Sequence, residues 1–151
     1  MSWAGTHNLK VIIDLHGAPG SQNGFDNSGH RVAYPAWHTE TDAVARTNAI
    51  IKTLASKFAN NPNVVPVIAP LNEPAGFYNE MMGTIKQYWI DSFGSVRFPY
   101  GSSQQVNLSR SCGCMRVPDI SDQQSNTIVL IHDAFKGLAY WNDFMTGGDA
   151  A

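Results

Sequence analysis

The chain has 151 residues, of which 43% are hydrophobic and 15% are charged, and its formal net charge is −2. This composition is typical of one globular domain and argues against a disordered chain. The small net charge gives no reason to expect nucleic acid or an anionic membrane as a partner. No apolar run approaches the ~20 residues of a membrane-spanning helix. The first ten residues, MSWAGTHNLK, lack the apolar segment of a signal peptide, so none is expected in this chain.

The N-terminal segments predict the end of a helix at residues 3–9 and then a strand. Residues 10–16, KVIIDLH, form a compact apolar run that ends in polar groups. Because side chains alternate along a strand, Asp14 and His16 share one face of it. His16 is therefore either a substrate-binding group or a strand-end histidine satisfied by Asp14 or the backbone.

Residues 17–31, GAPGSQNGFDNSGHR, are dense in Gly, Asn, Ser and Pro and predict a long loop. A loop of this length in a compact domain is usually functional or disordered. Phe25 at its centre is an aromatic residue in a polar setting, which favours a functional loop.

Two segments have helical periodicity. Residues 41–58 carry an apolar stripe at spacings of three and four, made of Val44, Thr47, Ile51, Leu54 and Phe58. A second helix is predicted from about residue 79 to 93, with a stripe made of Met82, Ile85, Trp89 and Phe93. We expect both stripes to pack against a sheet.

Between these helices, residues 64–77, VVPVIAPLNEPAGF, are an apolar run that breaks into Asn72-Glu73-Pro74. The run predicts a strand buried on both faces, as in parallel sheets. A carboxylate at such a strand end would be costly to bury without a purpose. In strand-helix barrels the catalytic groups lie at the carboxyl ends of the strands. Glu73 is therefore the first candidate for a catalytic residue.

A third strand is predicted at residues 127–132, TIVLIH, followed by a helix or loop at 136–145. His132 and Asp133 at its end either tie a loop to the sheet or belong to a site. The alternation of strands and helices predicts an α/β fold with a parallel sheet, in which His16, Glu73 and His132 converge at one edge. A doubly wound sheet would place its site at the same strand ends, so this pattern leaves both architectures open. The sequence Gly17-Ala-Pro-Gly20 lacks the spacing of a phosphate-binding fingerprint.

Three segments, KVIIDLHGAPGSQNGFDNSGH, APLNEPAGF and VLIHDAF, resemble glycoside hydrolase family 5, and more narrowly its fungal exo-β-1,3-glucanases (glucan 1,3-β-glucosidases). The resemblance implies a (β/α)8 barrel, of which residues 1–151 would be a fragment with about strands three to five and their helices. It also implies a secreted, monomeric enzyme of cell-wall glucan catabolism. Its substrate would be a β-glucan oligosaccharide or polysaccharide, and it would need no metal or other cofactor.

The same resemblance assigns site residues. Glu73 matches the general acid/base, Asn72 matches the neighbour that hydrogen-bonds the sugar 2-hydroxyl, and His16 matches a substrate-site histidine. Phe25 and Phe135 resemble aromatics that line the pocket entrance. Asp26 and Asn27, which follow Phe25 in the same loop, are further candidates for substrate contact.

A retaining glycosidase needs two carboxylates ~5–5.5 Å apart, and its acid needs a raised pKa. In the family the nucleophile lies on strand seven, beyond the end of this chain, so the resemblance implies no nucleophile here. Glu40 and Glu80 fall near helix starts and are interpreted as capping or solvated charges. We therefore expect this chain to be inactive alone. Two alternatives are a non-catalytic glucan-binding fragment and an unstable fragment whose open strand edges invite aggregation.

Residues 106–124 interrupt the resemblance. Joining Gln105 to Ser125 gives GSSQQSNTIVLIHDAF, which reads continuously in the manner of the family. Removing the interruption restores the pattern of the family, and the interruption begins at a valine codon. We therefore interpret it as a retained intron in an incomplete or mispredicted gene model. Finding only unspliced transcripts would reject this hypothesis. Its two cysteines, Cys112 and Cys114, supply too few ligands for a zinc site and are too closely spaced for an easy disulfide.

Overall fold

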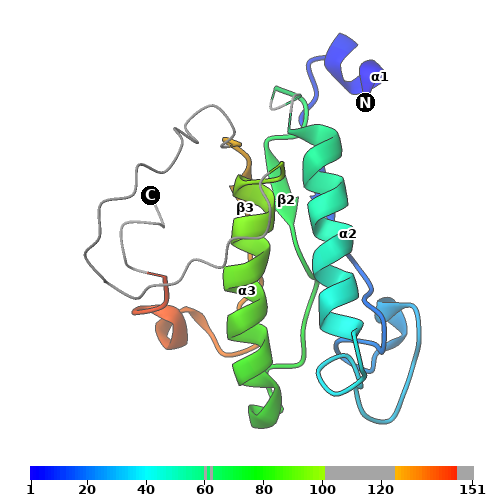
Figure 1. The fold of residues 1–151 in the computed structure, drawn as a ribbon, viewed down its shortest axis with the longest axis vertical. Coiled ribbons are helices and arrows are strands. Elements are labelled where there is room, and N and C mark those ends of the chain that lie inside the picture. The colour runs from blue at the N-terminus through cyan, green and yellow to red at the C-terminus, as the bar shows by residue number, and fades with distance from the viewer. Residues whose placement is uncertain (60, 62, 101–124, 146–151) are drawn as a thin grey trace.

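The computed structural model describes residues 1–59, 61, 63–100 and 125–145. Its centre is a parallel sheet in which the strands follow the order of the chain. Figure 1 shows them behind two long helices. The strands are shorter than predicted: β1 (Ile12–Asp14), β2 (Val67–Ala69) and β3 (Ile128–Val129). The segment 106–124, including Cys112 and Cys114, lies outside the described residues, so its interpretation stays a prediction.

Helical segments lie at or near their predicted positions. The α-helices are α1 (Ser2–Thr6), α2 (Ala43–Phe58) and α3 (Met82–Arg97). Short 3-10 turns are η1 (Asp26–Ser28), η2 (Asn79–Met81) and η4 (Leu138–Trp141). The last helix, α3, runs beyond the predicted end at about residue 93, because buried Val96 still packs against the sheet through Ile68.

The two long helices cover the same face of the sheet. Ile51 and Ala55 of α2 and Val96 of α3 cluster with Ile68 of β2, and Ile13 of β1 packs against them. The helices also pack against each other. Both predicted apolar stripes are confirmed as core-facing, with each member buried or half-buried. Thr47 fits this stripe because its hydroxyl accepts a hydrogen bond from buried Trp37 Nε1 at 3.0 Å and donates one to the Ala43 carbonyl.

A buried tyrosine fixes α3 to the end of β2. The Tyr88 hydroxyl donates a hydrogen bond to the Pro70 carbonyl at 2.9 Å. Burial raises the pKa of Tyr88, so the phenol stays a neutral donor. This contact fixes the position of α3 along its axis relative to β2, the strand that precedes Glu73.

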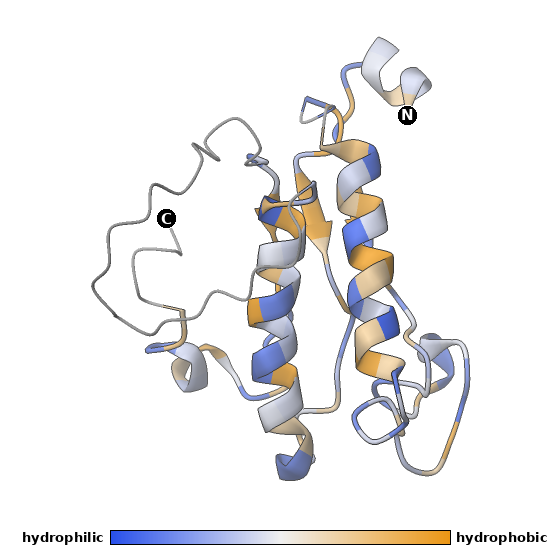
Figure 2. Ribbon diagram, in the orientation of Figure 1, coloured by the Kyte–Doolittle hydropathy of each residue, from blue (hydrophilic) through white to orange (hydrophobic). Residues whose placement is uncertain are grey.

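The opposite face of the sheet is uncovered within the described residues. Ile12 and Ile128 are 57% and 59% exposed, whereas Ile68, which points toward the helices, is 1% exposed. Val67 and Ala69 are only half-buried. The prediction that the second strand is buried on both faces is therefore wrong for this part of the chain, because both helices pack on one side. Figure 2 shows that β2, the strand visible between the two long helices, is nevertheless hydrophobic.

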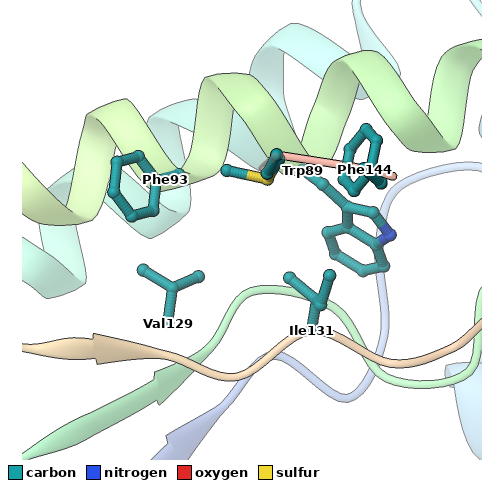
Figure 3. A pocket seen from close by; sticks show the side chains of 6 residues that line it. Trp89, Phe93, Val129, Ile131 and Phe144 are labelled. Atoms are coloured by element: carbon teal, nitrogen blue, oxygen red, sulfur yellow. The ribbon is translucent and has the colours of Figure 1, made fainter. Parts of the chain in front are cut away.

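An apolar pocket of about 190 Å³ lies between α3 and β3. Trp89 and Phe93 line it from α3, and Val129 and Ile131 line it from the third strand and the segment that follows (Figure 3). Trp89 is fully buried, yet its indole Nε1 has no hydrogen-bond partner among the described residues. Within the described part of the chain, the flank of α3 that faces this pocket is thus incompletely packed. No helix in the described part of the chain is long and apolar enough to cross a membrane.

The one-sided sheet predicts different costs for the same substitution on its two faces. Ile68→Ala should lower the free energy of unfolding by about 2–5 kcal/mol, because it leaves a cavity under the helices. The matched change Ile128→Ala should cost less than about 1 kcal/mol, because that side chain is already in water. Urea unfolding followed by circular dichroism measures both. Equal losses would mean that the second face is covered too.

Candidate active site

One buried glutamine joins the ends of the first two strands. Gln22 is fully buried, and its Nε2 donates hydrogen bonds to the carbonyls of His16 at 2.9 Å and Asn72 at 2.8 Å. Its Oε1 accepts from the Ala18 N–H at 3.0 Å, and its own carbonyl accepts from the Ala75 N–H at 3.0 Å. All the side-chain polar groups of Gln22 are therefore satisfied by backbone at the carboxyl end of the sheet.

The long loop after β1 is held by its own hydrogen bonds. Ser21 Oγ lies 2.6 Å from Ser28 Oγ and accepts from the Gly24 N–H at 2.9 Å. Gly17 passes so close to Ser28 that a Cβ there would lie 2.4 Å from the Ser28 carbonyl oxygen. Of the two alternatives for this loop, functional or disordered, these contacts argue against disorder, because they give the loop a fixed shape.

Glu73 lies a few residues beyond the end of β2, half-buried, and its Oε2 accepts a hydrogen bond from Asn27 Nδ2 at 2.7 Å. Asn23 Nδ2 donates in turn to Asn27 Oδ1 at 3.1 Å, which fixes the orientation of the Asn27 amide. The backbone of Glu73 has a φ of 45°, a left-handed conformation that costs a non-glycine residue about 1 kcal/mol or more. Strain of this kind is often found at functional sites.

His16 and Asn72 form a second polar pair at this end of the sheet, and Asn72 directly precedes Glu73 in the chain. His16 Nδ1 is 2.7 Å from Asp14 Oδ2, and His16 Nε2 is 3.4 Å from Asn72 Nδ2. This geometry fits an imidazole that donates from Nδ1 and accepts at Nε2. Of the alternatives for His16, the contact with Asp14 is present, and the exposed ring also contacts Asn72. Asp26, by contrast, is exposed at the start of η1, and the structure joins its side chain to none of the other candidates by a hydrogen bond.

The two aromatic candidates are linked by a third ring that the sequence prediction missed. Phe25 and Phe135 are 44% and 46% exposed, and Phe77, 45% exposed, lies between them. The ring centroid of Phe77 is 6.0 Å from that of Phe25 and 5.5 Å from that of Phe135. The available signal was its position in the same turn as Glu73, but aromatic residues in turns are too common to identify a site.

His132 and Asp133 hold the turn after β3. The His132 Nδ1 accepts from the Ala134 N–H at 2.9 Å. The Asp133 carboxylate accepts from the backbone N–H groups of Phe135 at 3.0 Å and Gly137 at 3.1 Å. Ala134 and Phe135 have φ values of 54° and 61°, so these bonds offset an unfavourable backbone. Of the two alternatives for this pair, the structure favours a loop-holding role.

Neither remaining glutamate fits the role of an acid catalyst. Glu80, in η2, accepts a hydrogen bond from the Tyr34 hydroxyl at 2.7 Å. Its own backbone N–H, and then Tyr34, hold its pKa below the ordinary glutamate value, the opposite of what a general acid needs. Glu40 is exposed. Of the two interpretations of these glutamates, the structure favours solvated charges, because both are exposed and neither α2 nor α3 has a side-chain capping bond.

No group of three or more His, Cys, Asp or Glu side chains within the described ranges is placed to hold a metal ion. The chemistry that this arrangement offers is therefore that of a half-buried carboxylate with an amide donor, a histidine-asparagine pair and a row of exposed rings.

Relatives of the chain are found among curated proteins, although no protein-family model matches it. It is 40% identical over 145 residues to a protein named glucan 1,3-beta-glucosidase from Blumeria graminis. It is 38% identical over 149 residues to a probable glucan 1,3-beta-glucosidase A from Emericella nidulans, and 30% identical over 156 residues to glucan 1,3-beta-glucosidase 2 from Candida albicans.

These alignments cover 96%, 97% and 99% of this chain, but only 28%, 30% and 27% of the respective relatives. The chain is similar to fungal glucan 1,3-β-glucosidases over nearly its whole length. It spans less than a third of theirs.

Removing the side chain of Gln22 should destabilise the carboxyl end of the sheet. Gln22→Ala leaves the carbonyls of His16 and Asn72 and the N–H of Ala18 without partners, which we expect to cost about 3 kcal/mol. Gln87→Ala is the matched control, because Gln87 is exposed and its amide donates to the side chain of Asp91 on the same helix; the loss of unfolding free energy should stay below about 0.5 kcal/mol. Chemical unfolding measures both, and similar losses would contradict the role of Gln22.

Removing the Tyr34 hydroxyl should change the titration of Glu80. In Tyr34→Phe, we expect the pKa of Glu80 to rise but to stay below its ordinary value, because its backbone N–H remains. In the unchanged protein the lowered pKa means that Glu80 contributes stability above its unfolded-state pKa, and that this contribution is lost as the pH falls through its folded-state pKa. Carboxyl-carbon NMR titration measures the shift, with Glu40 as an internal control. An unchanged Glu80 curve would contradict the contact.

Proposed function

We propose that this chain is the acid/base segment of a retaining β-1,3-glucan hydrolase of the exo-acting glucan 1,3-β-glucosidase type in glycoside hydrolase family 5. The observation that carries the proposal is Glu73, held by Asn27 at the carboxyl end of a parallel sheet, where its chain neighbour Asn72 contacts His16. Relatives that align with nearly all of the chain are named glucan 1,3-beta-glucosidase, which supports the same substrate. A secreted or cell-wall location follows from that substrate.

The fold that we propose for the whole enzyme is a (β/α)8 barrel, with β1, β2 and β3 as about its third to fifth strands. Two features support it. Both crossover helices lie on one face of the sheet, and the described residues leave the other, largely apolar face uncovered, as the inside of one barrel sector would be. The open pocket beside Trp89 and Val129 lies where a following helix would pack.

In the proposed reaction, Glu73 donates a proton to the glycosidic oxygen as the bond to the sugar breaks. The anomeric carbon of the sugar forms a bond to a second carboxylate as the leaving alcohol departs. In the second step, water attacks that carbon, the second carboxylate departs, and Glu73 takes the proton of the water. Asn27 orients the Glu73 carboxyl, while Asn72 and His16 contact sugar hydroxyls. The hydrogen bonds of Glu73 lead through Asn27 to Asn23 and, within the described residues, reach no second carboxylate.

A second candidate function is glucan binding without turnover, which the exposed rings of Phe25, Phe77 and Phe135 favour. An assay on laminarin of both the 151-residue chain and a full-length enzyme that contains it separates the two functions, because only an acid/base segment gives turnover in the full-length enzyme. We expect this chain to bind β-1,3-glucan and not to hydrolyse it, because a retaining reaction needs both carboxylates. Turnover by this chain alone would contradict that expectation.

The role of Glu73 can be tested in an active enzyme made by exchanging the aligned segment of the Blumeria graminis relative for this chain. Glu73→Gln should lower laminarin hydrolysis by about 10²–10⁴-fold, the usual contribution of a general acid. Formation of the glycosyl-enzyme from a dinitrophenyl glucoside should fall far less, because that leaving group departs without a proton. Glu80→Gln and Glu40→Gln are the matched controls and should leave both rates unchanged. Equal losses on the two substrates would contradict the acid role.

A further inference from the structure

We propose that Phe77 is a sugar-stacking residue that, together with Phe25 and Phe135, forms one aromatic face for a pyranose ring of the glucan. This inference rests on the proposed function and adds to it a residue that contributes to substrate binding. Phe77 belongs to the turn that follows Glu73, so the ring and the carboxylate are positioned by the same short segment.

The exposure of these rings is the first reason. Phe25, Phe77 and Phe135 come from the turns or loops after three different strands, and each keeps nearly half of its surface in water. The Phe25 and Phe77 rings are within 22° of parallel, and Phe135 is tilted by 54° against Phe77. The centroid distances of 6.0 and 5.5 Å lie within the range of favourable ring pairs. Contiguous exposed apolar surface of this kind is typical of a binding site.

The backbone on both sides of Phe77 is fixed. Gly76 lies so close to the turn after β3 that a Cβ there would be 2.2 Å from the Ala134 carbonyl oxygen. On the N-terminal side, the Ala75 N–H donates to the Gln22 carbonyl at 3.0 Å. The Tyr78 N–H donates to the Ala75 carbonyl at 3.0 Å. A ring on such a backbone loses little freedom when a ligand binds, which favours affinity.

The neighbours of this aromatic face identify its ligand as a sugar rather than an apolar molecule. Phe25 lies in the same loop as Asn27, whose amide donates to Glu73. A pyranose ring presents C–H groups on its faces and hydroxyls around its edge, so it needs apolar rings with polar groups at their border. Sites of this kind combine aromatic surface with a few placed polar groups. Phe77 lies at the middle of the surface, where the loss of one ring would separate the other two.

The test is the affinity of the 151-residue chain for laminaritetraose, measured by NMR titration with cellotetraose as a linkage control. Phe77→Leu keeps an apolar side chain but loses the flat ring, and we expect it to weaken binding by about five- to tenfold. Phe77→Tyr keeps the ring and should bind within about twofold of the original chain. Trp3→Leu is the matched control, because Trp3 is 66% exposed on α1, at the opposite end of the strands (Figure 1), and should bind normally.

Each outcome decides a different statement. Normal binding by Phe77→Leu would overturn the role of Phe77 and leave the proposed function intact, whereas a chain that binds no laminaritetraose would overturn both. Equal weakening by Trp3→Leu would also overturn the role. If Phe77→Leu loses its cooperative thermal transition, the role of Phe77 is tested instead by the ring resonances of Phe77 in the unchanged chain during titration with laminaritetraose. They should shift on titration, and their failure to shift would overturn the inference.

Discussion

The hydrogen bonds of one buried side-chain amide hold the carboxyl end of this sheet together. Gln22 reaches from the loop after β1 to the backbone carbonyls of His16 and Asn72, and its own carbonyl receives the N–H of Ala75. Because Gln22 is fully buried, each of these groups would cost free energy if it lost its partner. The positions of His16 and of the turn that contains Asn72 and Glu73 therefore depend on a residue that itself faces no substrate.

The turns at this end of the sheet contain unfavourable backbone. Glu73, Ala134 and Phe135 all have positive φ values, and they lie in the turns after β2 and β3. Local contacts offset this cost: Asp133 accepts from two backbone N–H groups, and Gly76 allows close approach to Ala134. Such strain persists only where surrounding contacts over-determine the conformation. Here the strained residues include Glu73 and Phe135, which lie in the turns after neighbouring strands at the same end of the sheet.

The same sheet is unevenly packed. One face lies under α2 and α3 with Ile68 almost fully buried, while Ile12 and Ile128 on the other face remain in water. An apolar face and open strand edges are costly in a free domain, since they leave hydrophobic surface exposed and invite pairing with other chains. Both features are what one sector of a closed barrel would have. The proposed site would lie at the carboxyl ends of the barrel strands.

Local patterns in the sequence were sufficient for the order of strands and helices, the core-facing stripes of α2 and α3, and the position of Glu73 after a strand. These features depend on residues a few positions apart, so periodicity and alternation reveal them. The structure alone decided that Asn27 contacts Glu73, that Gln22 joins two strands, that Phe77 bridges Phe25 and Phe135, and that only one sheet face is covered. Those contacts join residues about fifty positions apart or more, as in Gln22–Asn72 and Asn27–Glu73. No local pattern encodes them, because they exist only once β1, β2 and β3 lie side by side.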